Sequence, residues 1–86
     1  MSLLSENIIP GNYGKIFGTN AKVLEDLKKI KKRVLAVKGV KDVILNPEVF
    51  PLEFTVHTKE VVNVKDIEDA VIKSGFHSVA KDVFEL

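Results

Sequence analysis

The sequence predicts a small α+β domain with the element order strand, helix, strand, strand, helix, strand. Two stretches repeat apolar residues every three or four positions, which is typical of helices lying on a core. Other stretches are short, apolar or alternating, and are bounded by Gly, Asn and Pro, which favours strands joined by turns. The chain has 86 residues, enough for one domain. We therefore expect a lead-in segment over residues 1–12 and a single domain over residues 13–86.

The first strand is predicted over residues 13–17. Residues 18–20, Gly-Thr-Asn, should end this strand and supply the cap of the following helix. The lead-in before it holds apolar residues and a Pro-Gly-Asn turn at 10–12. That segment is expected either to be mobile or to lie against the domain.

The first helix has the clearest pattern in the chain. One apolar stripe has spacings of four, three, four and three, and consists of Val23, Leu27, Ile30, Val34 and Val37. Acidic residues come early in this stretch and basic residues come late, which suits the helix dipole. Gly39 is placed to end the helix.

Two further strands are expected at residues 40–45 and 54–58. They are joined by a rigid connection at 46–51 that contains two prolines. Because side chains alternate along a strand, Phe54 and Val56 should face the core.

The second helix should start at Asn63, a good N-cap residue, and end at Gly75. Its apolar positions are Ile67, Ala70 and Val71. A fourth strand would follow over residues 76–81. With right-handed crossovers, this order makes a four-stranded antiparallel sheet with both helices on one face, the ferredoxin-like βαββαβ arrangement.

Composition excludes several kinds of site. The chain has no cysteine, so disulfides, thiolate ligands and a cysteine nucleophile are excluded. It has no apolar run long enough for a membrane span, and its start does not resemble a signal peptide, so we expect a cytoplasmic protein. No nucleophile with a base and no paired carboxylates in a cleft can be recognised. We therefore expect no enzymatic activity.

Three stretches in order carry a family resemblance. They are Leu35-x-x-Lys38-Gly39-Val40-x-x-Val43-x-Leu45-Asn46, Phe54-x-Val56, and Ile67-x-x-Ala70-Val71-x-x-Ser74-Gly75-Phe76. In this order and spacing the sequence resembles the heavy-metal-associated domain of copper chaperones and metal-transporting ATPases, over about half of the chain. The resemblance implies a ferredoxin-like fold and a function in metal binding or transport.

The family's metal site is a Cys-x-x-Cys pair where the first helix opens. Counting back from Gly39, the two cysteine positions fall at Val23 and Asp26. Aligning residues 18–19 with the family's Gly-Met step moves them to Ala21 and Leu24. Neither alignment supplies a thiol, so the thiolate site is lost and no cofactor is expected.

A transition metal ion held by nitrogen and oxygen ligands is the remaining metal hypothesis. The candidate ligands are Asp26, His57 and His77. The two histidines fall on strands that flank the first strand, so strand spacing alone places their backbones roughly 10 Å apart. That separation is large for a shared ligand site.

The basic run at residues 28–33 raises the possibility of phosphate contacts. Glu25 can pair with Lys29 on the same helix, and acidic residues of the second helix can pair across, so we interpret the run as a solvated face. The open strands lack the aromatic residues with which RNA-recognition motifs stack bases. With a net charge of +1, no nucleic-acid partner is expected.

The remaining hypothesis is protein interaction through the uncovered sheet face. This face should include the following side chains: Ile44, Thr55, His57 and one of Ile16 or Phe17. Phe50 is expected either to plug the end of the core or to be an exposed anchor. A homodimer or another protein partner would cover this face. We thus predict a non-catalytic domain on a metal-carrier scaffold, with an interaction or regulatory module, or a small-ligand sensor of ACT type, as alternatives.

Overall fold

The computed structural model describes residues 7, 8, 10 and 14–81. Parts of the predicted lead-in and first strand, at residues 1–6, 9 and 11–13, lie outside this range, as do residues 82–86. The elements in chain order are β1 (Asn7–Ile8), β2 (Lys15–Thr19), α1 (Leu24–Leu35), β3 (Val40–Asn46), β4 (Glu53–Thr58), β5 (Val62–Asn63), α2 (Val64–Lys73) and β6 (Ser78–Ala80).

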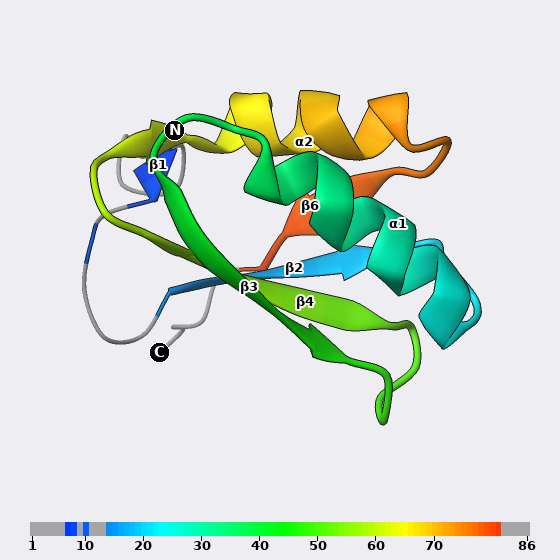
Figure 1. Cartoon of the computed structure of the whole chain (residues 1–86). Coiled ribbons are helices and arrows are strands. Elements are labelled where there is room, and N and C mark those ends of the chain that lie inside the picture. The colour runs from blue at the N-terminus through cyan, green and yellow to red at the C-terminus, as the bar shows by residue number, and fades with distance from the viewer. Residues whose placement is uncertain (1–6, 9, 11–13, 82–86) are drawn as a thin grey trace.

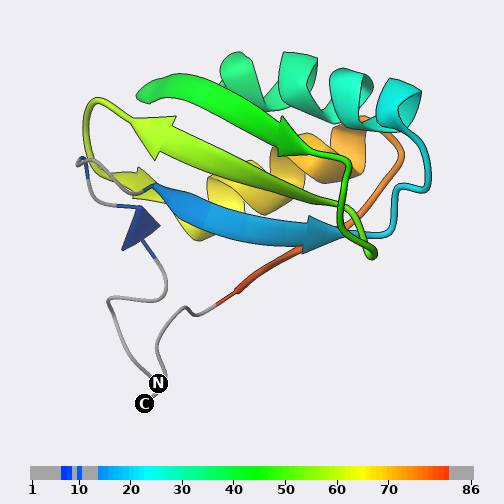
Figure 2. The same ribbon diagram turned by 90° about the horizontal axis from the view of Figure 1, so that it is seen from below.

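The larger sheet is antiparallel and has the strand order β3-β4-β2-β6. Figures 1 and 2 show α1 and α2 on the same side of this sheet. The chain is thus a small α+β protein with two helices and antiparallel sheets, compatible with a ferredoxin-like fold. Strand β3 lies at one edge of the larger sheet and β6 at the other.

The prediction of one sheet was incomplete, because β1 and β5 form a second, two-stranded sheet. Asn7 pairs with Asn63 and Ile8 with Val62. Ile8 is only 2% exposed and belongs to the hydrophobic core. The described part of the lead-in therefore lies against the domain, because burying an isoleucine side chain is favourable by about 2 kcal/mol.

Helix α1 buries the predicted stripe. Leu27, Ile30 and Val34 are fully buried, and Val37 packs partly against the core. Val23 lies outside the stripe, since it precedes the helix and is 52% exposed. The 3.6-residue period therefore predicted the buried face correctly and the first position incorrectly.

The predicted cap of α1 was wrong. Strand β2 ends at Thr19, two residues later than expected, because Thr19 still pairs with Ser78 of β6. Its hydroxyl donates to the backbone oxygen of His77 at 2.7 Å and accepts from the backbone N–H of Ala21 at 3.3 Å. Helix α1 begins at Leu24 with no side-chain cap hydrogen bond.

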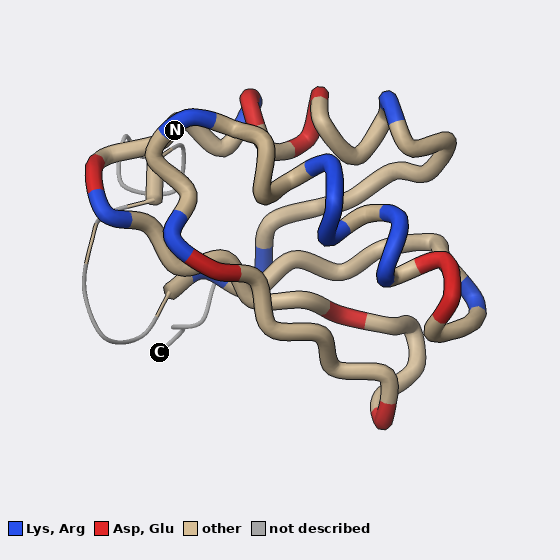
Figure 3. Tube along the Cα trace, viewed as in Figure 1, with Lys and Arg blue, Asp and Glu red and all other residues tan. Residues whose placement is uncertain are grey.

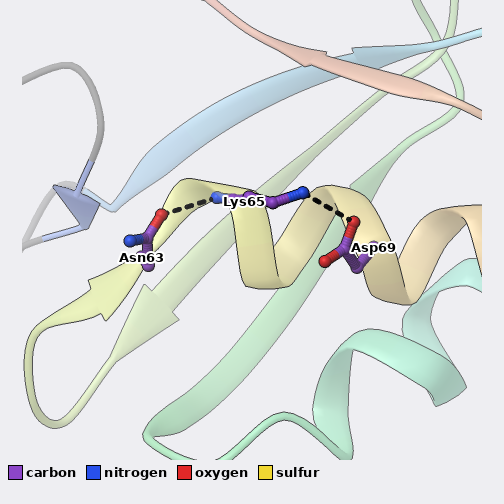
Figure 4. Close-up of polar contacts among 3 residues, drawn as sticks. All are labelled: Asn63, Lys65 and Asp69. Atoms are coloured by element: carbon purple, nitrogen blue, oxygen red, sulfur yellow. Dashed lines mark hydrogen bonds and ion pairs between the residues drawn. The ribbon is translucent and has the colours of Figure 1, made fainter.

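Helix α2 starts and ends as predicted. The Asn63 side chain accepts a hydrogen bond from the backbone N–H of Lys65 at 2.9 Å, and Lys65 pairs with Asp69 at 3.6 Å (Figure 4). At the other end, Gly75 has a φ of +98°, a left-handed conformation that suits glycine after a helix. The strand that follows, β6, is shorter than the predicted range 76–81.

The core lies between the helices and one face of the larger sheet. Phe17 and Phe54 are cross-strand partners whose rings stack with centroids 5.3 Å apart, and both are fully buried. Phe54 and Val56 face the core, as the alternation of β4 predicts, whereas Thr55 is half-buried on the other face. Because Phe17 is in the core, its neighbour Ile16, and not Phe17, lies on the uncovered face.

Candidate functional site

An apolar row crosses the uncovered face of the larger sheet. Thr55 lies between Ile44 of β3 and Ile16 of β2 in the strand register. Ile44 is 50% exposed, and Ile16 and Thr55 are half-buried. The helices cover only the opposite face, so this row faces away from the core.

A second row lies next to it and includes an ion pair. Gly18 lies between Glu53 and Val79 in the register, and Val79 is 69% exposed. The ammonium group of Lys81 pairs with the carboxylate of Glu53. A Cβ atom on Gly18 would lie 3.7 Å from Cδ of Lys81, so the absence of a side chain leaves room for the lysine stem to lie across the strand.

A third row, at one end of the face, is polar. Asp42 is the cross-strand partner of His57. The His57 ring lies close above Gly14, where an added Cβ would be 3.0 Å from the ring's Cε1. Gly14 has a φ of +73°, so both its backbone conformation and this contact favour glycine. The Asp42 carboxylate accepts the backbone N–H of Val43 at 2.8 Å.

A shallow hollow of about 430 Å³ adjoins the face at the end of β2. Its lining residues are Gly18, Thr19, Asn20, Pro51, His77, Ser78, Val79 and Lys81. Phe50, which directly precedes Pro51, is 80% exposed. Phe50 therefore does not plug the end of the core, and its side chain is exposed.

The metal candidates lie apart from one another. Lys15 pairs with Val56, which puts His57 at one end of β2, and Thr19 pairs with Ser78, which puts His77 at the other end. Six residues of strand separate these positions, or about 20 Å. The estimate of roughly 10 Å from the sequence was too short, because it counted the spacing between strands and not the offset along them.

The loop at the start of α1 offers no metal donor set of the family's kind. Val23 is an exposed apolar side chain, and Asp26 is partly exposed in the first helical turn. Of the alternative pair, Ala21 is buried and Leu24 is exposed. Among the described residues there is no group of three His, Cys, Asp or Glu side chains that could hold a metal ion. The residues present do not fit a thiolate-type metal ion.

Hydrogen bonds between His77 and Asn20 fix the loop between β2 and α1. The backbone N–H of His77 donates to Oδ1 of Asn20 at 2.8 Å, and the backbone N–H of Asn20 donates to the His77 oxygen at 3.4 Å. Together with the Thr19 hydroxyl, these contacts fasten the β2–α1 loop to the segment before β6.

Three residues of the face were missed by sequence reasoning: Gly18, Val79 and Lys81. Alternation along β6 could have indicated that Val79 faces outward. The contact of Lys81 with Glu53 depends on the register of β6 against β2, which carries no local sequence signal.

Comparisons with protein-family models, with curated proteins and with solved structures give no match. Within the described residues, neither helix has the length and apolar character needed to cross a membrane.

Proposed function

We propose that this chain is a non-catalytic protein-interaction domain that forms a homodimer through the uncovered sheet face. The residues of this face on which the proposal rests are Ile16, Ile44, Thr55, His57 and Val79. We also assign the fold to the ferredoxin-like class, which the strand order β3-β4-β2-β6 and the placement of both helices on one side support.

The observation that carries the proposal is the exposure of Ile44 and Val79 on this face. At 50% and 69% exposure, each leaves much of a large apolar side chain in water. Covering it would contribute about 2 kcal/mol per side chain at most. Flanked by Ile16 and the methyl group of Thr55, these side chains form a patch of the kind found at protein interfaces.

Charge favours a second copy of the chain as the occupant. Two surfaces of like sign repel, so a face can pair with itself only where its charges nearly cancel. The uncovered face carries Asp42, Glu53 and Lys81, with Glu53 and Lys81 already paired. The outer side of α1, in contrast, has five basic residues at 28, 29, 31, 32 and 33.

The hollow next to the face adds a specific contact. It has a volume of about 430 Å³, and Pro51 is one of its lining residues. In the proposed dimer, Phe50 of each copy inserts into the hollow of the other. Exposed aromatic side chains that fill a partner's pocket commonly dominate the energy of an interface.

In the proposal, the resemblance to heavy-metal-associated domains concerns only the scaffold, that is, the core and the order of its elements. The family's carrier function depends on two thiolates, and this chain has no cysteine. In our proposal the scaffold keeps its core and uses its open face for association.

The test compares two isoleucines of equal exposure. Ile44 is 50% exposed on the uncovered face, and Ile72 is 53% exposed on α2. Sedimentation equilibrium up to about 100 µM should show a dimer for the wild type and for Ile72→Asp. Ile44→Asp should weaken the dimer by at least about tenfold, because it places a carboxylate in the interface. Circular dichroism should show that both variants fold.

Two outcomes would contradict the proposal. One is a wild-type chain that stays monomeric over the whole concentration range. The other is a dimer that Ile44→Asp and Ile72→Asp weaken equally, since the interface would then not involve the sheet face. If Phe50→Ala leaves the dimer affinity unchanged, Phe50 does not fill the hollow and the hollow is not part of the interface.

A further inference from the structure

A basic groove lies between the two helices, on the side of the molecule away from the uncovered sheet face. It has a volume of about 400 Å³. Its lining residues are Lys29, Lys32, Arg33 and Ala36 of the α1 segment, with Lys73 and Ser74 from the end of α2. Four of these six residues are cationic, and none is acidic. Two helices far apart in sequence thus contribute positive charge to one groove.

The four cations have no carboxylate partner within the described part of the chain. Among the described residues, Lys65 pairs with Asp69 and Lys81 with Glu53, and neither pair includes a residue of the groove. The expected pairing of Glu25 with Lys29 is not formed, and neither is any pairing across the helices. An exposed pair of this kind is too weak to hold two long side chains together. The four cations are therefore not held in direct ion pairs by described residues, although Arg33 and Lys73 also line the hollow that contains Asp66 and Asp69.

Acidic residues bound the basic groove on both sides. Glu25 and Asp26 occupy the first turn of α1. At the other side, an adjoining hollow is lined by Asp66 and Asp69 of α2. Figure 3 shows this order, with acidic residues at the start of α1 and in the first half of α2, and basic residues between them. An extended polyanion would meet carboxylates in either direction.

We propose that this groove binds a compact anion carrying two or more phosphate groups. Lys29, Lys32 and Arg33 have the spacing i, i+3, i+4, so they share one face of α1 within one turn, or about 6 Å. Arg33, the only arginine of the chain, provides the planar fork that pairs with two phosphate oxygens at once. Lys73 approaches the same anion from α2.

Two small residues, Ala36 and Ser74, also line the groove. Ala36 has no side chain beyond Cβ and offers no polar group to a ligand. The Ser74 hydroxyl donates to the backbone oxygen of Val71, so it has no proton left for a ligand. Binding therefore depends on the four cations, and the affinity should rise with the number of phosphate groups.

The test is a calorimetric titration of the full chain with three probes at low ionic strength: inorganic tripolyphosphate, inorganic orthophosphate and a single-stranded DNA oligonucleotide. We expect tripolyphosphate to bind with one-to-one stoichiometry and more tightly than orthophosphate. Arg33→Gln and Lys73→Gln should each weaken tripolyphosphate binding by about fivefold. Lys28→Gln removes the same charge from α1 outside the lining and should change the affinity less than about twofold.

Specific results would overturn the inference. No binding of tripolyphosphate would do so, as would an equal loss in Lys28→Gln and Arg33→Gln, which would indicate a diffuse charge effect. If the oligonucleotide bound as tightly as tripolyphosphate, with the same dependence on Arg33, the ligand would be nucleic acid and not a compact anion. Because Ile44 is remote from the groove, Ile44→Asp should leave the titration unchanged whatever its effect on the dimer.

Discussion

Two buried threonines differ in whether their hydroxyl groups form hydrogen bonds. Thr19 is 5% exposed, and its hydroxyl donates to the His77 oxygen and accepts from the Ala21 N–H. Thr58 is 4% exposed, and its hydroxyl has no hydrogen-bond partner among the described residues. Valine has nearly the same shape as threonine, so Thr19→Val and Thr58→Val change hydrogen bonding with little change in packing.

The expected changes in the free energy of unfolding differ between the two variants. Thr19→Val removes two hydrogen bonds and leaves the N–H of Ala21, a residue only 2% exposed, without that partner. The loss should be about 2 kcal/mol. Thr58→Val replaces an unpaired buried hydroxyl by a methyl group, which should be neutral or stabilise by up to about 1 kcal/mol. The two variants should therefore differ by about 2–3 kcal/mol.

Urea unfolding followed by circular dichroism, at one fixed protein concentration, measures both values. In a domain of this size, Thr19→Val should also lower the Tm by about 10 °C. Equal destabilisation by both variants would refute the reasoning, because it would show that the Thr58 hydroxyl is also satisfied or that the methyl group does not fit. A neutral Thr19→Val would show that the junction with His77 does not stabilise the fold.

Two further predictions concern turns and caps. Gly39→Ala should cost about 2–3 kcal/mol, since Gly39 has a φ of +96° and an added Cβ would lie 2.7 Å from Cγ2 of Val62. Gly75→Ala should cost only about 1 kcal/mol, because φ is +98° there but nothing lies within 4 Å of the added Cβ; equal losses by urea unfolding would contradict the steric argument. Asn63→Ala should lower the free energy of unfolding by about 1 kcal/mol, because it removes the oxygen that accepts the N–H of Lys65. Asn63→Asp should keep this hydrogen bond and the stability. Thermal unfolding tests the prediction, and equal Tm values for the two variants would contradict it.

Part of the uncovered sheet face could be predicted from the sequence. Alternation in β4 places Thr55 away from Phe54 and Val56, and alternation in β3 separates Ile44 from Val43, which is buried. A strand has a side-chain period of two, so one buried residue assigns the faces of its neighbours. The choice between Ile16 and Phe17 stayed open because both are apolar, and packing against Phe54 decided it.

The sequence by itself determined the features that depend on near neighbours along the chain. These are the order of the two helices and of the four strands of the larger sheet, the buried residues of the α1 stripe, the cap at Asn63 and the end of α2 at Gly75. Each follows from the 3.6-residue or two-residue period, or from a side chain that bonds its own backbone. Such local terms act before any distant segment is in place.

Only the tertiary structure decided the features that join distant segments. Among them are the pairing of Ile8 with Val62, the ion pair of Lys81 with Glu53, and the placement of His57 and His77 at opposite ends of β2. The basic groove formed by Arg33 and Lys73 belongs to the same group. These arrangements depend on strand register and on how the two helices pack, which the whole core sets together, so no local pattern specifies them.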